Sequence, residues 1–208
     1  MSFGTFVKSA RDVINTGLHF LPVFLAFTIF TVGITTWNIS FILLFVGMFA
    51  VLPLGVILFT YIFRFTPIPL FKSTESLFPI VEAAAKNANS SNNHISFGFS
   101  MLIFLFTYLI ANAAQLIKTN EEPEIRGRAS MSIAIVSIVA IIYFVSHILK
   151  ETPETGVGIG VLTILGISLG VSWFYMMDAC GKSIADVYGV ENNKYVTEES
   201  AALCVVSN

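Results

Sequence analysis

Several stretches of at least 20 residues in this chain contain no Asp, Glu, Lys or Arg. A bilayer core about 30 Å thick is crossed by roughly 20 apolar residues in a helix. Because backbone amides in hydrocarbon must find partners within their own helix, these stretches predict membrane-spanning helices. The composition agrees, since 55% of residues are hydrophobic and only 12% are charged. We therefore expect an all-α, polytopic transmembrane helix bundle.

Five spans are predicted within a bundle that covers residues 17–177. They comprise residues 17–37, 41–63, 95–117, 129–149 and 157–177. The link between the first two spans is so short that they must form an antiparallel hairpin. Pro53 lies in the middle of the second span and lacks a backbone N–H, which predicts a kink there. A four-span arrangement, in which the last stretch lies differently, is the alternative.

The segments outside the spans predict surface structure. Residues 1–16 place apolar side chains on one stripe, which indicates a short interfacial helix, with a frayed tail as an equal alternative. Residues 79–88 predict a second short helix on the membrane surface. The charged residues 118–128 predict a solvated loop. Residues 178–208 predict a polar C-terminal tail that ends in an apolar patch at 201–206.

Charges around the first hairpin favour an N-terminus in the cytoplasm. Lys8 and Arg11 precede the hairpin, Arg64 follows it, and its tip carries no basic residue. Over the whole chain, the basic residues are almost equally divided between the two sides. Trp37 and Trp173 fall near the ends of the first and fifth spans on the same side, which predicts two interfacial anchors.

The fifth span is rich in small residues spaced four apart. Such spacing lets helix backbones approach closely, so it predicts helix packing. The residues concerned are Gly156, Gly160, Gly166, Gly170, Ser168 and Ser172. Ser130, Ala134 and Ser137 form a matching stripe on the fourth span. The packing can lie within one chain or between the subunits of a homo-oligomer.

Tyr108, Asn112 and Gln115 lie on one face of the third span, near its far end. Polar side chains inside spans are costly in lipid and are frequently functional. Two interpretations stay open, namely interhelical hydrogen bonding and a polar path for a permeating solute. No charged residue lies inside any predicted span, which argues against ion-coupled transport.

Residue patterns for catalysis, metal binding or cofactor binding are missing from the sequence. The three histidines have no second ligand at i+3 or i+4, and the two cysteines lack metal-ligand spacing. No nucleophile triad or carboxylate pair emerges, and a net charge of −2 does not suggest nucleic acid as a partner. The sequence therefore predicts a non-catalytic protein without a cofactor or metal.

The favoured hypothesis is a structural or assembly protein of a membrane. Such a protein would span a lipid bilayer and dock other proteins through its loops and C-terminal tail. A larger membrane-associated complex, such as an organellar assembly or the inner membrane of a virion, would suit it. The apolar patch at residues 201–206 supports docking, because it would otherwise be exposed. The alternative is a small membrane channel or transporter whose path includes Asn112 and Gln115. Which membrane holds the chain is not indicated.

Overall fold

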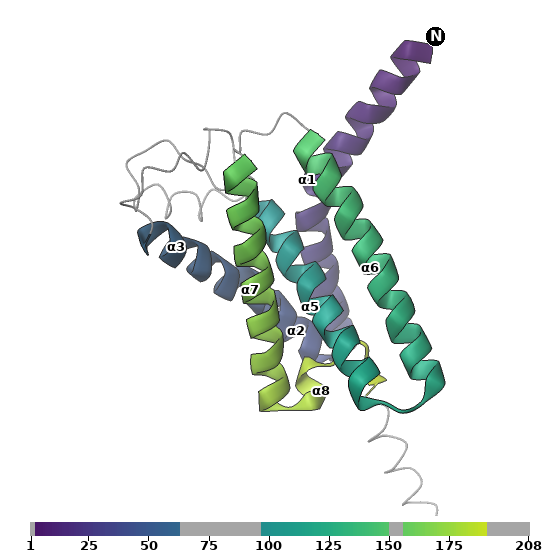
Figure 1. Cartoon of the computed structure of the whole chain (residues 1–208), viewed down its shortest axis with the longest axis vertical. Helices are drawn as coiled ribbons and strands as arrows, with labels where there is room; N and C mark the ends of the chain where they lie inside the picture. Colours follow the sequence, from purple (N-terminus) through teal and green to yellow (C-terminus); the bar gives the residue numbers. More distant parts are fainter. Residues whose placement is uncertain (1–2, 63–96, 150–155, 191–208) are drawn as a thin grey trace, which may run out of the picture.

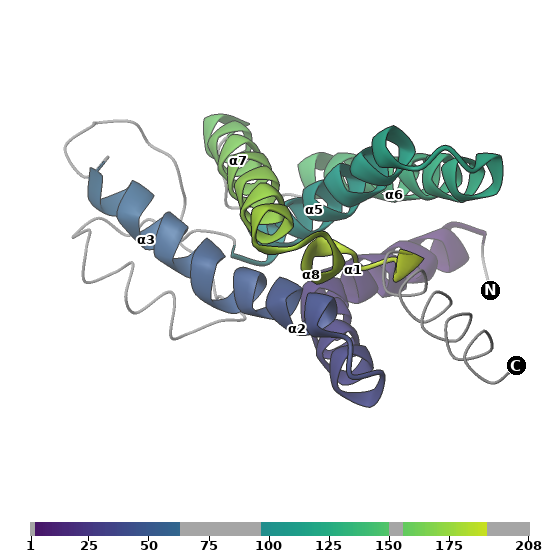
Figure 2. The ribbon, with the colours of Figure 1, turned by 90° about the horizontal axis from the view of Figure 1, so that it is seen from below.

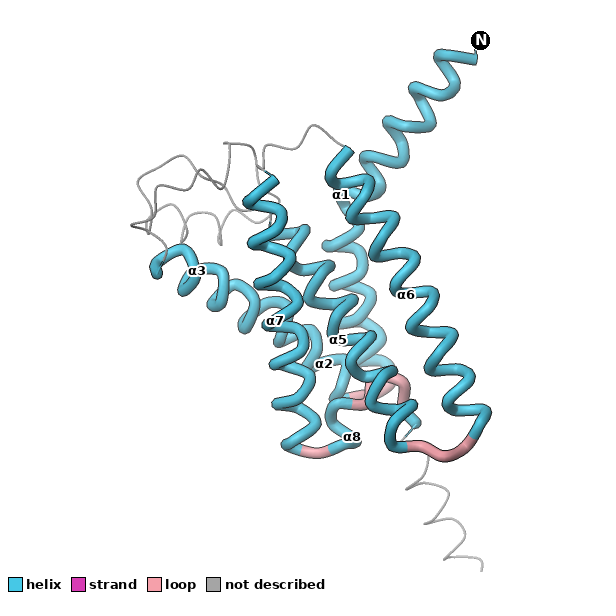
Figure 3. Tube along the Cα trace, viewed as in Figure 1, coloured by secondary structure: helices cyan, strands magenta, loops and turns pink. Residues whose placement is uncertain are grey.

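In a computed structural model, residues 3–62, 97–149 and 156–190 are described, and they form helices joined by short turns (Figures 1 and 3). The elements are α1 (Phe3–Thr35), α2 (Ile39–Val46), the π turn η1 (Gly47–Val51), α3 (Leu52–Ile62), α5 (Phe97–Thr119), α6 (Pro123–Leu149), α7 (Gly156–Cys180) and α8 (Lys182–Ala185). The prediction of an all-α transmembrane bundle is confirmed. The segments predicted at residues 79–88 and 201–206 lie outside the described residues.

Among the described residues, four helices are long and apolar enough to cross a membrane. They are Ile39–Phe59, Phe97–Thr119, Pro123–Ile148 and Gly158–Cys180. A fifth apolar stretch, Phe20–Thr35 in α1, is shorter. The α1–α2 hairpin, the α5–α6 loop and α8 lie together at one end of the bundle, which we call the α8 end (Figure 1). The N-terminus lies beyond the opposite end of the bundle (Figure 1).

The first helix, α1, is continuous over 33 residues. At 1.5 Å per residue it is about 50 Å long, which exceeds the thickness of the hydrocarbon core. Its first turns extend beyond the ends of α6 and α7 in Figure 1. The segment predicted to be interfacial is thus helical and continuous with the first span. Its position in the headgroup region stays a prediction.

The α1–α2 hairpin closes through a backbone motif that ends many helices. Asn38 N–H donates to the carbonyl of Gly33 at 3.1 Å, and Trp37 N–H donates to that of Ile34 at 3.3 Å. Trp37 occupies the left-handed position with φ of 51°, where glycine is usual. Its side chain is 88% exposed at the tip of the hairpin. That exposure agrees with the interfacial anchor predicted for Trp37.

The other tryptophan does not act as an interfacial anchor. Trp173 of α7 is only 8% exposed. Its Nε1 donates to the carbonyl of Leu43 at 3.1 Å, and its indole lies against Gly47, the first residue of η1. An added Cβ at Gly47 would lie 2.5 Å from Nε1, so this packing needs glycine. The prediction for Trp173 was wrong, because hydropathy does not distinguish an interhelical donor from an anchor.

The second span is interrupted by a π turn just before Pro53. Leu52 N–H donates to the carbonyl of Gly47, five residues earlier, instead of to the residue four earlier. Proline cannot donate the next helical hydrogen bond, so a local change of helix type is favoured at this place. The predicted irregularity therefore takes the form of η1.

Helix α6 begins at an earlier residue than the predicted fourth span, which started at residue 129. Pro123 is its first residue and Glu124 lies in its first turn, so the loop between α5 and α6 is much shorter than predicted. Proline suits the first helical position, and an acidic residue there interacts favourably with the helix dipole. The exposed side chains of α6 are mostly apolar and include Met131, Ile135, Ile138 and Ile142, as expected of a face that contacts lipid.

The central helix of the bundle is α5. It contacts α1, α6 and α7, and it lies between α6 and α7 in Figure 2, which views the bundle from the α8 end. Its side chains from Phe99 to Phe106 are all buried. The core therefore surrounds α5, and it includes Leu44, Met48 and Leu52 from the second span.

Two of the predicted packing glycines bring α7 close to α5. A Cβ added at Gly170 would lie 2.8 Å from the carbonyl oxygen of Phe104, and one at Gly166 would lie 2.9 Å from Cγ2 of Ile103. This close approach lets the two backbones pack directly. Ser130 and Ala134 of α6 are exposed, so the predicted matching stripe on α6 is not the partner of these glycines.

The other small residues of α7 are placed differently. Gly160, Ser168 and Ser172 are exposed, and nothing lies within 4 Å of a Cβ added at Gly160. Gly156 is the first residue of α7. Of the six small residues predicted for packing, Gly166 and Gly170 are the ones that the structure places against α5.

Replacing Gly170 with alanine should destabilise the bundle, whereas replacing Gly160 should not. The new methyl group at Gly170 must push against the backbone of α5, which we expect to cost about 1–3 kcal/mol. At Gly160 the methyl group meets open space, and the higher helix propensity of alanine is worth up to about 1 kcal/mol in favour of folding. Thermal unfolding of both variants in detergent measures the difference. Equal stability would contradict direct α5–α7 packing through Gly170.

Candidate functional site

Beyond α7, the chain turns back and packs against the bundle. We call residues 181–190 the latch segment, which contains the single turn α8 and continues to Val190. Gly189 has φ of +72°, a left-handed conformation that favours glycine and turns the chain. Ala185, Asp186 and Val187 are buried. The first part of the predicted polar tail is therefore not free in solvent, while residues 191–208 lie outside the described chain.

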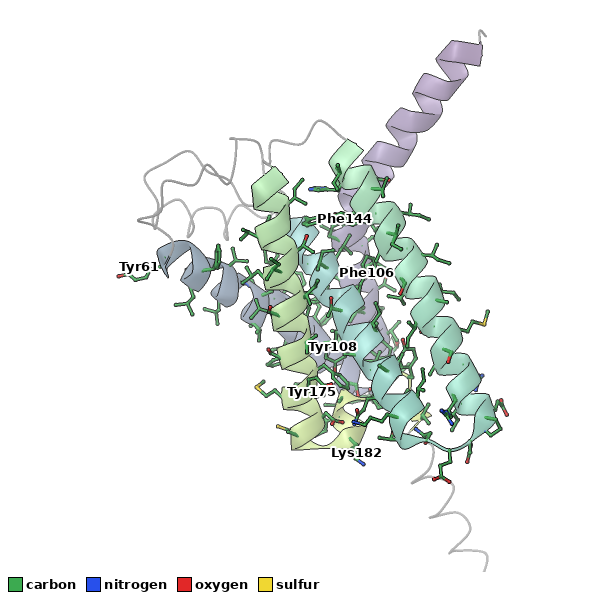
Figure 4. All side chains as sticks on the ribbon, viewed as in Figure 1. Tyr61, Phe106, Tyr108, Phe144, Tyr175 and Lys182 are labelled. Atoms are coloured by element: carbon green, nitrogen blue, oxygen red, sulfur yellow. The ribbon has the colours of Figure 1, made fainter. Side chains whose placement is uncertain are left out.

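Two of the three predicted polar side chains hold the latch segment. Tyr108 Oη donates to the carbonyl of Ala185 at 3.1 Å, and Asn112 Nδ2 donates to the same carbonyl at 2.9 Å. The two residues are one turn apart on α5, so their donors converge. Their side chains are 0% and 2% exposed. Figure 4 shows Tyr108 on α5 in the half of the bundle nearer the α8 end.

Packing from α7 orients Tyr108. The ring of Phe174 meets that of Tyr108 edge to face, with centroids 5.5 Å apart and an interplanar angle of 84°. Aromatic pairs favour this arrangement because the positive ring edge meets the negative face. Phe174 is itself buried in the core. The hydroxyl of Tyr108 is thus directed to Ala185 by a rigid neighbour.

A second tyrosine, Tyr188, joins the latch segment to α5 and α6. The hydroxyl of Tyr188 lies 2.6 Å from Ser132 Oγ and donates to the carbonyl of Leu109 at 3.4 Å. Tyr188 N–H donates to Asp186 Oδ1 at 3.0 Å, which closes a local turn. Tyr188 and Val190 pack against an apolar cluster of Ala113, Leu116 and Ala129. The latch segment therefore connects three helices at the α8 end.

The surroundings of Tyr188 favour its neutral form. Burial raises the pKa of its hydroxyl above the ordinary value of 10.0, and the carboxylate of Asp186 adds to the increase. The hydrogen bond with Ser132 opposes it by lowering the pKa. A neutral hydroxyl can both donate and accept, which the contacts with Leu109 and Ser132 require.

A small cavity of about 20 Å³ lies between α5, α7 and the latch segment. Its lining consists of Asn112, Gln115, Leu116, Thr119, Phe174, Asp178, Lys182, Ala185 and Asp186. A cavity of this volume holds about one water molecule. Gln115, the third predicted polar residue, is half-buried and lines this cavity. Tyr108, Asn112 and Gln115 are therefore close together, on the side of α5 that faces the latch segment.

This arrangement positions a chain segment against α5 and α6. Within the described residues, no group of three or more His, Cys, Asp or Glu side chains comes together. Ser132, Asp186 and Tyr188 are site residues that sequence reasoning missed, since they lie outside the expected polar face. The apolar residues Ile184, Ala185, Val187 and Val190 close behind α7 could have indicated that this segment packs against the bundle.

Comparison with known proteins finds no matching family model, no similar curated protein and no similar solved structure. The function must therefore be inferred from the geometry of the bundle and of the latch segment. The features available are the contacts within the chain, the exposed apolar helices and the small cavity beside the latch segment.

Removing a hydrogen bond to Ala185 should open the latch segment. We would introduce Val187→Cys, a position that is 8% exposed, after replacing Cys180 and Cys204 with serine. Asn112→Leu should then increase the rate of thiol alkylation about tenfold, because one buried hydrogen bond contributes about 1 kcal/mol or more. The control is Thr31→Val, which removes a hydroxyl bonded within its own helix. An unchanged rate in Asn112→Leu would contradict the role of Asn112.

Alkaline pH should release Tyr188 from its site. Because the folded-state pKa is raised, the contribution of Tyr188 to stability is fully present below pH 10.0 and is lost as the pH rises through the folded-state pKa. The tyrosinate absorbance of the natural chain minus that of Tyr188→Phe should give a midpoint above pH 10.0. A midpoint at or below that value would mean that Tyr188 is exposed to solvent.

Proposed function

We propose that this chain is a non-catalytic structural or assembly protein of a membrane. The bundle anchors it in a lipid bilayer as a multi-pass protein. Other proteins dock at the α8 end, where the α5–α6 loop and the C-terminal tail emerge. The partner is another membrane-associated protein or a second copy of this chain, within a larger assembly such as an organellar complex or the inner membrane of a virion.

The main support for the proposal is that polar side chains of α5 form hydrogen bonds with a segment of the same chain. Tyr108 and Asn112 are buried and donate to Ala185 of the same chain. A route for a solute needs polar groups that line an open path. Here those groups hold a peptide segment, and the cavity beside them has a volume of only about 20 Å³. This supports a structural role more than a channel or transporter.

The latch segment also supports docking at the α8 end. Tyr188 and Val190 pack between α5 and α6, so the chain beyond residue 190 starts from a defined place. Exposed charged residues of the α5–α6 loop and the start of α6 lie at the same end, including Glu121, Glu122 and Glu124. Fixing the start of a binding segment reduces the entropy that docking must overcome. We propose that the loop and the tail form one docking surface.

We also propose an orientation of the chain in the membrane. The charges around the first hairpin favour an N-terminus in the cytoplasm, and an odd number of crossings then places the α8 end on the opposite side. Docking partners are therefore expected on the side away from the cytoplasm. Tagging each terminus and testing its accessibility to protease in sealed vesicles measures this orientation.

Photo-crosslinking in the native membrane tests the proposed docking surface. A photoreactive amino acid is placed at Glu121 in the α5–α6 loop or at Asn193 in the tail. Both positions should give discrete protein adducts, because partners contact this end. The control position is Ile164 of α7, which is 67% exposed on the apolar surface and should react with lipid. Co-expression of two differently tagged copies identifies adducts between copies of the chain.

The channel alternative predicts other results. The purified chain in liposomes would then carry a solute flux that falls when Gln115 is replaced with leucine, and Glu121 and Asn193 would give no protein adducts. That pair of results would overturn the structural proposal. Protein adducts at both positions, together with a flux that Gln115→Leu does not change, would support it.

A further inference from the structure

The tip of the α1–α2 hairpin, which we define as residues 34–39, carries an exposed apolar surface. Its large apolar side chains Ile34, Trp37 and Ile39 are 48%, 88% and 61% exposed. Exposed apolar residues continue from there along α1, where Phe27 is 69% exposed. An apolar surface of this kind on a membrane helix contacts lipid. The hairpin tip is therefore an extension of the lipid-facing surface of α1.

Charge distinguishes the hairpin tip from the other segments at the α8 end. No Asp, Glu, Lys or Arg occurs between Asp12 and Arg64. By contrast, the α5–α6 loop includes Glu121 and Glu122, and α8 begins with Lys182, and all three of these side chains are exposed (Figure 1). Charged groups favour water strongly over lipid. They therefore hold the loop and α8 in water, whereas the hairpin tip has no such group.

Polar groups of the turn find partners within the hairpin itself. Thr36 Oγ1 donates to the carbonyl of Val32 at 2.6 Å, and Asn38 Oδ1 accepts from Ser40 N–H at 2.9 Å. The backbone N–H groups of Thr36, Trp37 and Asn38 donate to carbonyls of α1. A loop normally lies in water because its backbone polar groups need partners there. These internal hydrogen bonds reduce the need of the hairpin tip for water.

The backbone at Trp37 indicates that its side chain has a role. Its φ of 51° lies in the left-handed region, which glycine adopts more readily than any other residue. A bulky residue held in such a conformation points to a function of the side chain. The indole combines an apolar ring with one N–H donor, and tryptophan is enriched where acyl chains meet headgroups. That boundary suits both parts of the exposed Trp37 side chain.

We propose that the hairpin tip lies within the bilayer, at the boundary between acyl chains and headgroups, with Ile34, Trp37 and Ile39 in contact with lipid. A position in water would expose this apolar surface. A position deeper in hydrocarbon is excluded, because the carbonyls at the end of a helix need partners that acyl chains do not provide. The hairpin tip is thus separate from the docking surface formed by the α5–α6 loop and the tail. This inference goes beyond the proposed function and does not depend on it.

Fluorescence quenching in vesicles tests the position of the hairpin tip. The chain has two tryptophans, so the emission of the natural chain minus that of Trp37→Phe isolates Trp37. The variant should fold normally, since the replaced side chain is exposed. The full-length chain is reconstituted in phosphatidylcholine whose acyl chains carry bromine either near the glycerol or near the chain end. We expect the larger loss of Trp37 emission with bromine near the glycerol, and little loss with acrylamide in the aqueous phase.

A control tryptophan on the apolar surface of α7 calibrates the depth. Ile164, which is 67% exposed, is replaced with tryptophan in the Trp37→Phe chain, and its emission should fall most with bromine near the chain end. The same pattern for Trp37 would overturn the proposal, because the hairpin tip would lie deeper in hydrocarbon. Quenching of Trp37 by acrylamide and not by brominated lipid would place the tip in water and overturn it too. Protection from both quenchers would mean that a protein, such as a second copy of the chain, covers the tip in place of lipid, and this would also overturn it.

Discussion

The requirement that backbone groups in hydrocarbon be hydrogen bonded governs this structure. Continuous helices meet it without side chains, so interhelical hydrogen bonds concentrate where a helix is interrupted or ends. Trp173 donates to Leu43 beside the π turn, and Tyr108 and Asn112 donate to Ala185 where α8 ends. Asn38 caps α2 by accepting from Ser40 N–H at the hairpin. These side-chain hydrogen bonds therefore lie where a helix is interrupted or ends.

The buried helix α5 makes the candidate site possible. Gly166 and Gly170 let α7 approach the backbone of α5 along the middle of the bundle. The end of α7 is then close enough for the latch segment to reach Tyr108, Asn112 and Leu109. Apolar packing determines the distance between the helices, and hydrogen bonds determine which residues of the latch segment occupy the space at the α8 end. Both the apolar packing and the hydrogen bonds are needed to place the latch segment against α5.

Four of the five predicted spans correspond to helices long and apolar enough to cross a membrane, because a single physical quantity, the length of an apolar run, determines them. Pro123 could also have indicated where α6 begins, because proline suits the first position of a helix. The neighbouring charged residues instead led to the prediction of a loop. The contacts of Trp173 and Tyr188 could not be deduced. Tyr188 meets Ser132 across 56 positions of sequence, and periodicity carries no information about which helices are neighbours. The polar face of Tyr108, Asn112 and Gln115 was identified, whereas the chain segment beside it was not.

The separation in sequence between the donors and the acceptor of the latch segment affects biosynthesis. Tyr108 and Asn112 precede Ala185 by 77 and 73 residues. At ribosomal speeds of about 5–20 residues per second, the two side chains are made roughly 4–15 s before their acceptor. During that interval α5 is a newly inserted helix whose tyrosine and amide need temporary partners, such as water, lipid headgroups or the insertion machinery. Once Ala185 has been made, its carbonyl can replace those partners.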